Sequence, residues 1–399
     1  MSGPGVFARL VGQEPVAAEL ARAASRPRSM THAWLFTGPP GSGRSVAARA
    51  FAAALQCERE DRRGCGECPR CRQVLGGSHP DLTLVATETT FLQVREAREL
   101  ALASQARPTV GPWRVILVED ADRLTEKAAD ALLKALEEPP PRTVWLLCAP
   151  SWEDLIVTIR SRCRHVQLRT PPVDAVVRLL QSDGVDPPLA HYAARAAQSH
   201  IGIARRLATD ESERARRREL TSMPLRLTGL GEALAAAAEV EETSKESSGT
   251  QSEEDATRRR RELLVQLGAD PDARTQPPSV RAHLRQLEED GKRRARRRQH
   301  DALDAALGTL ASVYRDALVL STGAEVEPVN ATELEQVRQL TRTLPPEWLL
   351  QALDTIGLAR QRLEANGTPL LVLEAMMIGL VLPGAGPGQQ VRRRERTAR

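Results

Sequence analysis

The sequence predicts an α/β domain followed by helical domains, and three observations carry this expectation. Short apolar runs alternate with helix-like runs over residues 1–168, and beyond them only helix-like patterns recur. The chain has 399 residues, which suits two or three domains rather than one core. Because apolar strands separated by helices form parallel sheets, we expect a parallel sheet with helices on both faces in the first domain.

Four apolar runs predict the strands of this sheet, and helix-like runs separate them. The expected strands are His32–Gly38, Asp81–Thr87, Trp113–Asp120 and Thr143–Pro150. Ser45–Cys57 follows the first strand as an alanine-rich helix. Leu124–Pro141 forms a second helix, which three consecutive prolines stop.

The rest of the chain predicts three further parts. Residues 169–208 form a small helical module, and residues 209–385 form a larger helical domain. Val240–Thr257 is polar, acidic and nearly free of large apolar groups, so we expect a disordered insertion. A charged stretch, Glu288–His300, contains the basic patch Arg293–Arg298. Residues 386–399 are expected to be a flexible basic tail.

The composition excludes several classes of protein. Hydrophobic residues make up 41% of the chain and aromatic residues 3%, so the cores must be aliphatic. A net charge of +4 is too small for a dedicated DNA-coating protein. No signal peptide and no apolar run of about 18 residues is present, so we expect a cytosolic chain without a membrane span. Six cysteines in that compartment favour a metal site or buried thiols over disulfides.

A glycine-rich loop follows the first expected strand and precedes a helix, which is the context of a phosphate-binding loop. Backbone N–H groups and the helix N-terminus of such a loop attract phosphate oxygens. Arg44 replaces the lysine expected before Ser45, the candidate Mg²⁺ ligand, and the planar guanidinium is a poor substitute for an ammonium group. ATP with Mg²⁺ is therefore possible at a degenerate site. The loop residues are Gly38, Pro39, Pro40, Gly41, Ser42, Gly43, Arg44 and Ser45.

Two acids end the third expected strand and complete the nucleotide site. Glu119 and Asp120 stand where a strand that follows a phosphate loop carries Asp and then Glu. The reversed order gives each side chain the wrong reach by one methylene. Errors of about 1 Å near the reacting atoms can reduce a rate on the order of 100-fold. Nucleotide binding can survive these changes better than hydrolysis.

Four cysteines form the sharpest local motif. Cys57 precedes Cys65, Cys68 and Cys71, which are two C-x-x-C steps. Four thiolates without an open position predict a structural, tetrahedral Zn²⁺ site.

Several segments together resemble subunits of bacterial sliding-clamp loaders, which are AAA+ proteins. They are Ser161-Arg162-Cys163, Leu124–Pro140, His79-Pro80-Asp81, Val11–Glu14, His200–Leu207 and Ala359–Leu380, together with the position of the cysteine cluster. The resemblance covers residues 1–208 well and residues 305–385 more loosely. It implies an AAA+ module at residues 1–168 with an inserted zinc module at 57–71, a helical lid at 169–208 and a helical collar for oligomerisation at 209–385.

The resemblance also implies site residues. Arg162 corresponds to the arginine finger that reaches a neighbouring subunit's ATP, and Arg205 to the sensor 2 arginine of the lid. The sensor 1 position falls on Ala149-Pro150, which offers no hydroxyl or amide side chain. Because the loop lysine, the acid order and sensor 1 are all altered while Arg162 remains, the combination resembles delta-prime subunits of DNA polymerase III. Such stator subunits work with tau/gamma motor subunits and a delta subunit to load the sliding clamp on primer-template DNA.

Two alternatives remain open on the sequence. The chain could be an active tau/gamma-like ATPase motor, in which Arg44 and the reversed acids still work. It could instead be a nucleic-acid-binding protein whose cysteine cluster is a zinc ribbon. The basic patch Arg293–Arg298 is a weak indication of direct DNA contact. No paired carboxylates in a polymerase context are found, so we do not expect this chain to polymerise DNA itself.

Overall fold

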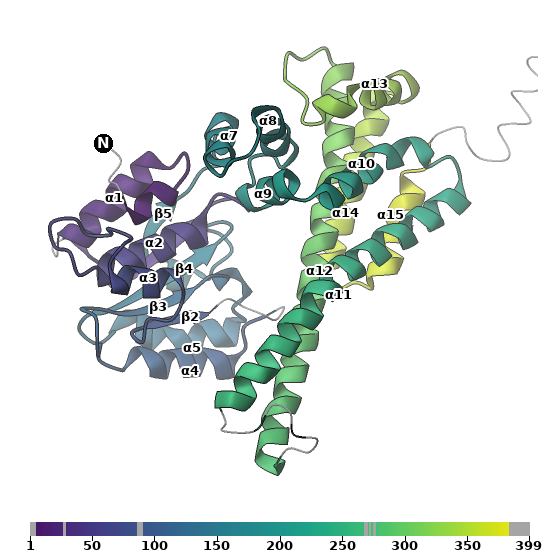
Figure 1. Ribbon diagram of the computed structural model, residues 1–399. Helices are drawn as coiled ribbons and strands as arrows, with labels where there is room; N and C mark the ends of the chain where they lie inside the picture. The colour runs from purple at the N-terminus through teal and green to yellow at the C-terminus, as the bar shows by residue number, and fades with distance from the viewer. Residues whose placement is uncertain are drawn as a thin grey trace, which may run out of the picture. The chain divides into compact units, whose positions relative to one another are not determined.

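The computed structural model describes residues 5–26, 29–85, 91–266, 270, 273 and 277–382. The chain divides into two compact units, residues 1–209 and 210–399 (Figure 1). The predicted basic tail at 386–399 and the last two residues of the predicted strand Asp81–Thr87 lie outside the described residues. Among the described helices, none combines the length and the hydropathy that crossing a membrane requires.

A parallel sheet of five strands forms the centre of the first unit. The strands are β1 (Ala33–Thr37), β2 (Leu82–Val85), β3 (Arg114–Val118), β4 (Thr143–Ala149) and β5 (Arg164–Gln167), in the order β2-β3-β4-β1-β5. The four strands expected from apolar runs are confirmed, each slightly shorter than its run. The edge strand β5 is more polar, since only Val166 of its residues is buried, and it lies within the segment that the resemblance singled out.

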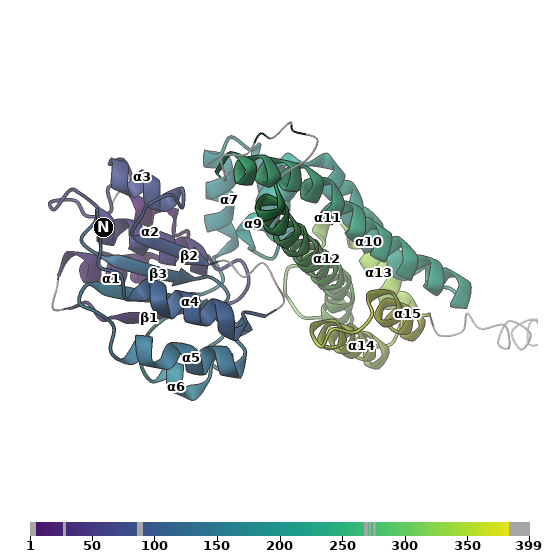
Figure 2. The ribbon, with the colours of Figure 1, turned by 90° about the horizontal axis from the view of Figure 1, so that it is seen from below.

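Helices cover both faces of the sheet, as the sequence predicts (Figure 2). One face carries the 3₁₀ helix η1 (Val6–Arg9), α1 (Glu14–Ser25), α2 (Arg44–Gln56) and α3 (Pro69–Leu75). The other face carries α4 (Val94–Ser104), α5 (Glu126–Glu137) and α6 (Val157–Arg160), and the short η3 (Ala121–Arg123) follows β3. Alternate residues of β1 serve the two cores, because successive strand side chains point to opposite faces: Trp34 packs in one and Leu35 in the other.

Three helices complete the first unit and have a small core of their own. They are α7 (Val173–Ser182), α8 (Pro187–Ala196) and α9 (Ile201–Thr209). Leu180, Ala193 and Leu207 are among the buried residues between them. The helices of this bundle are short, and they match the helix-like runs of residues 169–208.

Every regular element among the described residues of the second unit is a helix. Its helices are α10 (Glu211–Arg226), α11 (Leu230–Gln266), α12 (Pro278–Ser321), η4 (Ala331–Glu333), α13 (Leu334–Thr343), α14 (Pro346–Glu364) and α15 (Pro369–Gly379). Helices α10 to α15 all contribute to one apolar core, and Leu307, Tyr314 and Leu373 are among its fully buried members. Asp316 is also buried there, and its carboxylate accepts hydrogen bonds from the backbone N–H and side-chain amide of Asn330.

The predicted disordered insertion is corrected by the structure. Val240–Thr257 lies inside α11, which runs without interruption to Gln266 and packs against α12. The sequence of this segment contains no proline and one glycine, Gly249, so it is compatible with a helix. A Lys245–Glu241 ion pair at 2.8 Å supports one turn. Contact with α12 stabilises this helix, and the polar composition of Val240–Thr257 gives no sign of that contact.

Candidate functional site

The glycine-rich loop joins β1 to α2 with the backbone that a phosphate loop needs. Gly43 caps the helix N-terminus with φ 92°, and Gly41 has φ 81°, a conformation that favours glycine. Pro39 and Pro40 are exposed, whereas Ser45 is half-buried in the first turn of α2. The loop therefore presents a helix N-terminus of the kind that attracts anions.

Arg44 is folded back onto its own loop. Its Nη1 donates a hydrogen bond to the carbonyl oxygen of Gly38, the first residue of the loop. A half-buried guanidinium therefore lies across the loop, at the position where a lysine would extend to phosphate. Gly38 is fixed further, because its N–H donates to the carbonyl oxygen of Pro150 at 3.0 Å.

The acids that follow β3 are brought beside the loop helix, and one of them is already paired. Arg49 Nε lies 2.7 Å from Glu119 Oε1, and the Glu119 side chain is 14% exposed. Burial, and then the negative charge of Asp120, raise the pKa of the neighbouring Asp122, while Arg44 opposes that shift. The structure thus gathers Glu119, Asp120 and the loop arginine into one charged cluster.

The two residues expected at the sensor positions, Ala149 and Arg205, are a buried alanine and an arginine that pairs with an acid. Ala149 ends β4 fully buried in the core and offers only a methyl group. Arg205 on α9 donates to Asp183 Oδ2 at 3.0 Å, which ties it to the end of α7. Arg205 is accordingly engaged within the three-helix bundle.

The bundle contacts the loop through His200. A Cβ added to Gly41 would lie 2.5 Å from His200 Cγ and 2.6 Å from its Cα, so only glycine fits here. Burial lowers the pKa of the His200 imidazole, and the charges of Arg206 and Arg44 lower it further. A second link comes from Gln13, whose amide contacts the carbonyl oxygens of Ser42 at 3.4 Å and Arg169 at 2.5 Å. The loop is therefore covered by Gln13 and His200, which lie in two segments that carry the resemblance but were assigned no contact there.

Arg162 lies at the opposite end of the edge strand, in the turn between α6 and β5. Its side chain is 33% exposed and forms an ion pair with Glu137, the last residue of α5. Cys163 beside it packs half-buried against the core formed by α4, α5 and α6, and burial raises the pKa of its thiol. The three-residue motif therefore places one anchored residue next to one accessible arginine.

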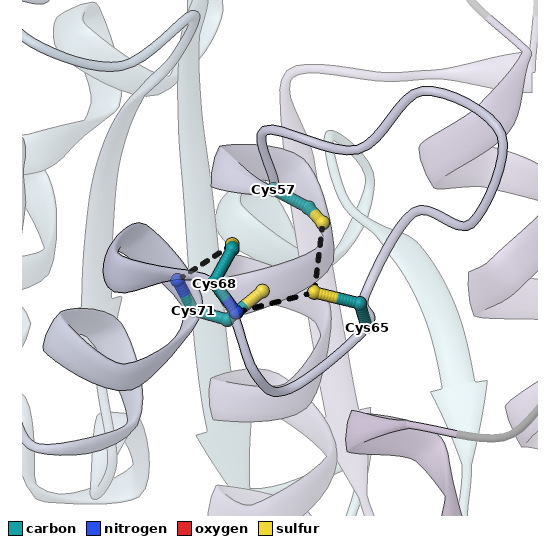
Figure 3. Close-up of side chains that lie close together, drawn as sticks. All are labelled: Cys57, Cys65, Cys68 and Cys71. Carbon is teal, nitrogen blue, oxygen red and sulfur yellow. Dashed lines mark hydrogen bonds between the residues drawn. The ribbon is translucent and has the colours of Figure 1, made fainter.

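The four cysteines converge as their spacing predicts (Figure 3). Their sulfur atoms all lie within 4.8 Å of one another, and all four residues are buried. The Sγ atoms of Cys57 and Cys65 are 3.7 Å apart. A tetrahedral Zn²⁺ with Zn–S bonds of about 2.3 Å would separate its sulfurs by about 3.8 Å. These residues therefore fit a zinc ion and could bind one.

Backbone N–H groups favour the thiolate form of Cys65, whereas burial raises the pKa of Cys71. The N–H groups of Glu67 and Cys68 donate to Cys65 Sγ at 3.5 and 3.4 Å. Burial alone would raise the pKa of Cys65, but these two donors help lower it to about 7. The cysteines also belong to the same core as η1 and α2. This integration differs from the free-standing ribbon of the nucleic-acid-binding alternative.

Sequence reasoning missed four contacts at these sites, made by Gln13, Arg49, Glu137 and His200, although all of these residues except Arg49 lie inside segments that carry the resemblance. Each acts on a motif residue far away in the chain, so local spacing does not reveal it. A partial signal existed for Arg49, since it lies on the same helix as Arg44 and five residues after it.

Comparisons with known proteins match the first unit. The family described as "DNA polymerase III, delta subunit" matches residues 12–172. The tau/gamma subunit of Haemophilus influenzae is 34% identical over 206 residues, which cover 50% of this chain and 30% of that protein. The delta-prime subunit of Pseudomonas aeruginosa is 38% identical over 160 residues, 39% of this chain and 49% of that protein.

The chain is also similar to a solved structure, a DNA polymerase III gamma-subunit-related protein of Thermotoga maritima. The match covers 90% of this chain and 97% of that protein. Its TM-score is 0.38 at 16% identity. The matches span between 30% and 49% of the length of these curated relatives. The delta-prime and tau/gamma relatives match at similar identity, so they support the shared family rather than one subunit type.

Proposed function

We propose that this chain is a member of the AAA+ clamp-loader family of the DNA polymerase III delta-prime, tau and gamma subunits, which its first unit resembles, and that it acts as a delta-prime (stator) subunit. It assembles through its helical second unit with tau/gamma motor subunits and a delta subunit. The complex opens the sliding clamp and places it on primer-template DNA. The chain itself contributes an arginine to a neighbour's ATP site and does not hydrolyse ATP at its own loop.

The observation that carries this proposal is the internal pairing of the nucleotide site. Arg44 binds the Gly38 carbonyl, and Arg49 binds Glu119 at 2.7 Å. An acid that orients an attacking water must accept its proton or its hydrogen bond, and a carboxylate held by a guanidinium is a weaker acceptor. The cationic side chains also lie next to the acids that would otherwise help to hold Mg²⁺. Arg49 thus neutralises the acid that would otherwise activate an attacking water.

Arg162 is the group through which the chain would act on ATP. It is accessible and follows a core-anchored helix at the edge of the sheet. An arginine supplied by a neighbour stabilises charge on the transferred phosphoryl group, and removing it can reduce the rate on the order of 10³-fold. Catalysis would then take place in a site that this chain completes but does not own.

The cysteine cluster would hold a structural Zn²⁺ in this proposal. Cys57, Cys65, Cys68 and Cys71 would each give one thiolate. A closed set of four thiolates leaves no position for a substrate, so the ion would supply folding stability alone. The ion would hold the loop before α3 in place. This loop in turn is joined to η1, because the N–H of Val6 donates to Gly64 O at 2.9 Å.

Steady-state ATP turnover by the purified chain tests the proposal. We expect no turnover above that of an Arg44→Ala variant, which serves as the control for contaminating ATPases. Arg44→Ala removes the loop cation while leaving the backbone of the loop and its helix in place. Turnover that Arg44→Ala abolishes would instead identify an active tau/gamma-like motor in which the arginine performs the lysine's role.

A further inference from the structure

The guanidinium of Arg162 is held by three acceptors within its own chain. Its Nη1 donates to the carbonyl oxygen of Thr158 at 2.6 Å and to Ser161 Oγ at 3.1 Å. Its Nη2 contacts Glu137 Oε1 in an ion pair. Two of these acceptors are local, since Thr158 lies in α6 and Ser161 directly follows it. Glu137 is not, since it is the last residue of α5, 25 positions earlier in the chain.

The Arg162 guanidinium keeps some of its N–H groups available for a further partner. A guanidinium has five N–H groups in a rigid plane. Three of them meet Thr158, Ser161 and Glu137. Among the described residues, the Nε–H and the second N–H of Nη2 have no recorded acceptor. The side chain is thus fixed in orientation while two N–H groups remain for an incoming anion, such as phosphate oxygens.

The position of Glu137 is unfavourable for the helix that carries it. The C-terminal end of a helix is its negative end, so a carboxylate there is disfavoured and a cation is favoured. Arg162 supplies that cation to Glu137 at the end of α5. The two side chains are 33% and 43% exposed, and pairs of such exposure add little to stability. Stability is therefore a weak explanation for this contact.

We propose that Glu137 is a positioning residue that orients Arg162 for insertion into a neighbouring subunit's ATP site. The inference rests on the proposed function of Arg162 as an arginine finger. A free arginine side chain samples many rotamers and would have to be ordered at each encounter. The carboxylate fixes the guanidinium plane beforehand, and the remaining N–H groups meet the phosphate without a search. Glu137 touches no substrate and acts only through Arg162.

The test uses the complete clamp loader assembled with this chain. ATP turnover is measured at the site that adjoins the chain, with the other motor sites silenced in their own phosphate loops. We expect Glu137→Ala to lower kcat by about 3- to 30-fold, with KM for ATP and assembly unchanged, because only the orientation of the finger is lost. Glu137→Gln keeps an oxygen that can accept from Nη2, so it should recover part of kcat. The neighbouring exposed residue provides a matched control, Glu138→Ala, which should behave as wild type.

A double-mutant cycle separates positioning from a general effect on the fold. Adding Glu137→Ala to Arg162→Ala should change nothing further, since the residue acts through the arginine. If Arg162→Ala lowers turnover while Glu137→Ala leaves kcat equal to wild type or raises it, the positioning role is wrong and the finger stands. If Arg162→Ala itself has no effect, the proposed function of the finger fails. Additive losses in the double variant would also overturn the inference.

Discussion

At the scale of single residues, Asp81 shows how one buried carboxylate can fasten a loop. It is 1% exposed and accepts hydrogen bonds from the N–H groups of Thr109, Val110 and Gly111 at 2.6 to 2.8 Å. Burial alone would raise its pKa, but these donors and the Thr109 hydroxyl lower it to about 2. The folded state thus prefers the ionised form more strongly than the unfolded chain does.

The sign of this shift gives a pH-dependent prediction. A carboxyl whose pKa falls from 3.8 to about 2 contributes stability that is complete above about pH 4 and is lost as the pH falls toward 2. We expect Asp81→Asn to lower the free energy of unfolding of the first unit by about 2 kcal/mol at pH 7. That penalty should shrink toward zero near pH 2. Urea titration followed by tryptophan fluorescence reports mainly this unit, which holds four of the five tryptophans.

Asp186→Asn is the matched control, because Asp186 is exposed and its side chain makes no capping hydrogen bond. It should change the free energy of unfolding by less than about 0.5 kcal/mol at either pH. A penalty for Asp81→Asn that stays constant between pH 7 and pH 2.5 would show that the ionised carboxylate is not its source.

Motifs located the site residues because the chemistry demands fixed spacing, but they did not give the residues' partners. The loop, the acids after β3 and the cysteines all come from short sequence patterns. That Glu119 is bound by Arg49, and Arg162 by Glu137, depends on how separate elements pack. Arginine is frequent in this chain, so the sequence alone does not indicate which arginines pair with the site residues. The fold decides this, because it brings particular arginines next to particular acids.

At the scale of elements, the strands and the helical character of residues 209–385 were predictable, but the unbroken course of α11 through Val240–Thr257 was not. Strands β1, β3 and β4 are buried along nearly their whole length, so their apolar runs are continuous. Helix α11 carries little apolar surface, and it is ordered by pairing with α12. Sequence composition cannot distinguish such a helix from a disordered segment, because the stabilising contacts come from a partner more than 30 residues away.

The far end of this helix pair gives the prediction at the element scale. We call Thr257–Gln266 of α11 and Pro278–Asp290 of α12 the distal arm. Among its described side chains, Leu264, Val280 and Leu284 form a buried apolar cluster. Leu284→Ala should cost about 2 kcal/mol, the lower limit for a buried leucine. Amide hydrogen exchange in the distal arm should then become about 30-fold faster.

The same exchange experiment contains its own controls. Peptides around Leu307 and Tyr314, which are buried in the main core of the second unit, should keep the wild-type rate. Arg285→Ala changes the exposed neighbour of Leu284 and should leave the distal arm at the wild-type rate as well. Unchanged exchange in Leu284→Ala would mean that the cluster does not hold the arm together.

At the scale of the whole molecule, the two units have separate cores, and only the first contains the cysteine cluster. Metal binding to a site that exists only in the folded state adds its free energy to folding. Removal of zinc should therefore destabilise residues 1–209 and leave residues 210–399 unchanged. We expect the metal-stripped protein, or Cys65→Ser, to lower the Tm of the first unit by about 10 °C or more, since 1 kcal/mol corresponds to about 2–4 °C at this size.

Two probes distinguish the units in one thermal scan. Tryptophan fluorescence follows mainly the first unit, and helical circular dichroism also follows the second, whose described regular elements are all helices. Cys163→Ser removes a thiol outside the cluster, so this variant should keep one zinc per chain and the wild-type response. Equal shifts in both transitions would mean that the units unfold together. If wild-type protein contains no zinc and Cys65→Ser does not change its Tm, the thiols are ordinary core residues, and hydrophobic packing alone holds η1 against α2.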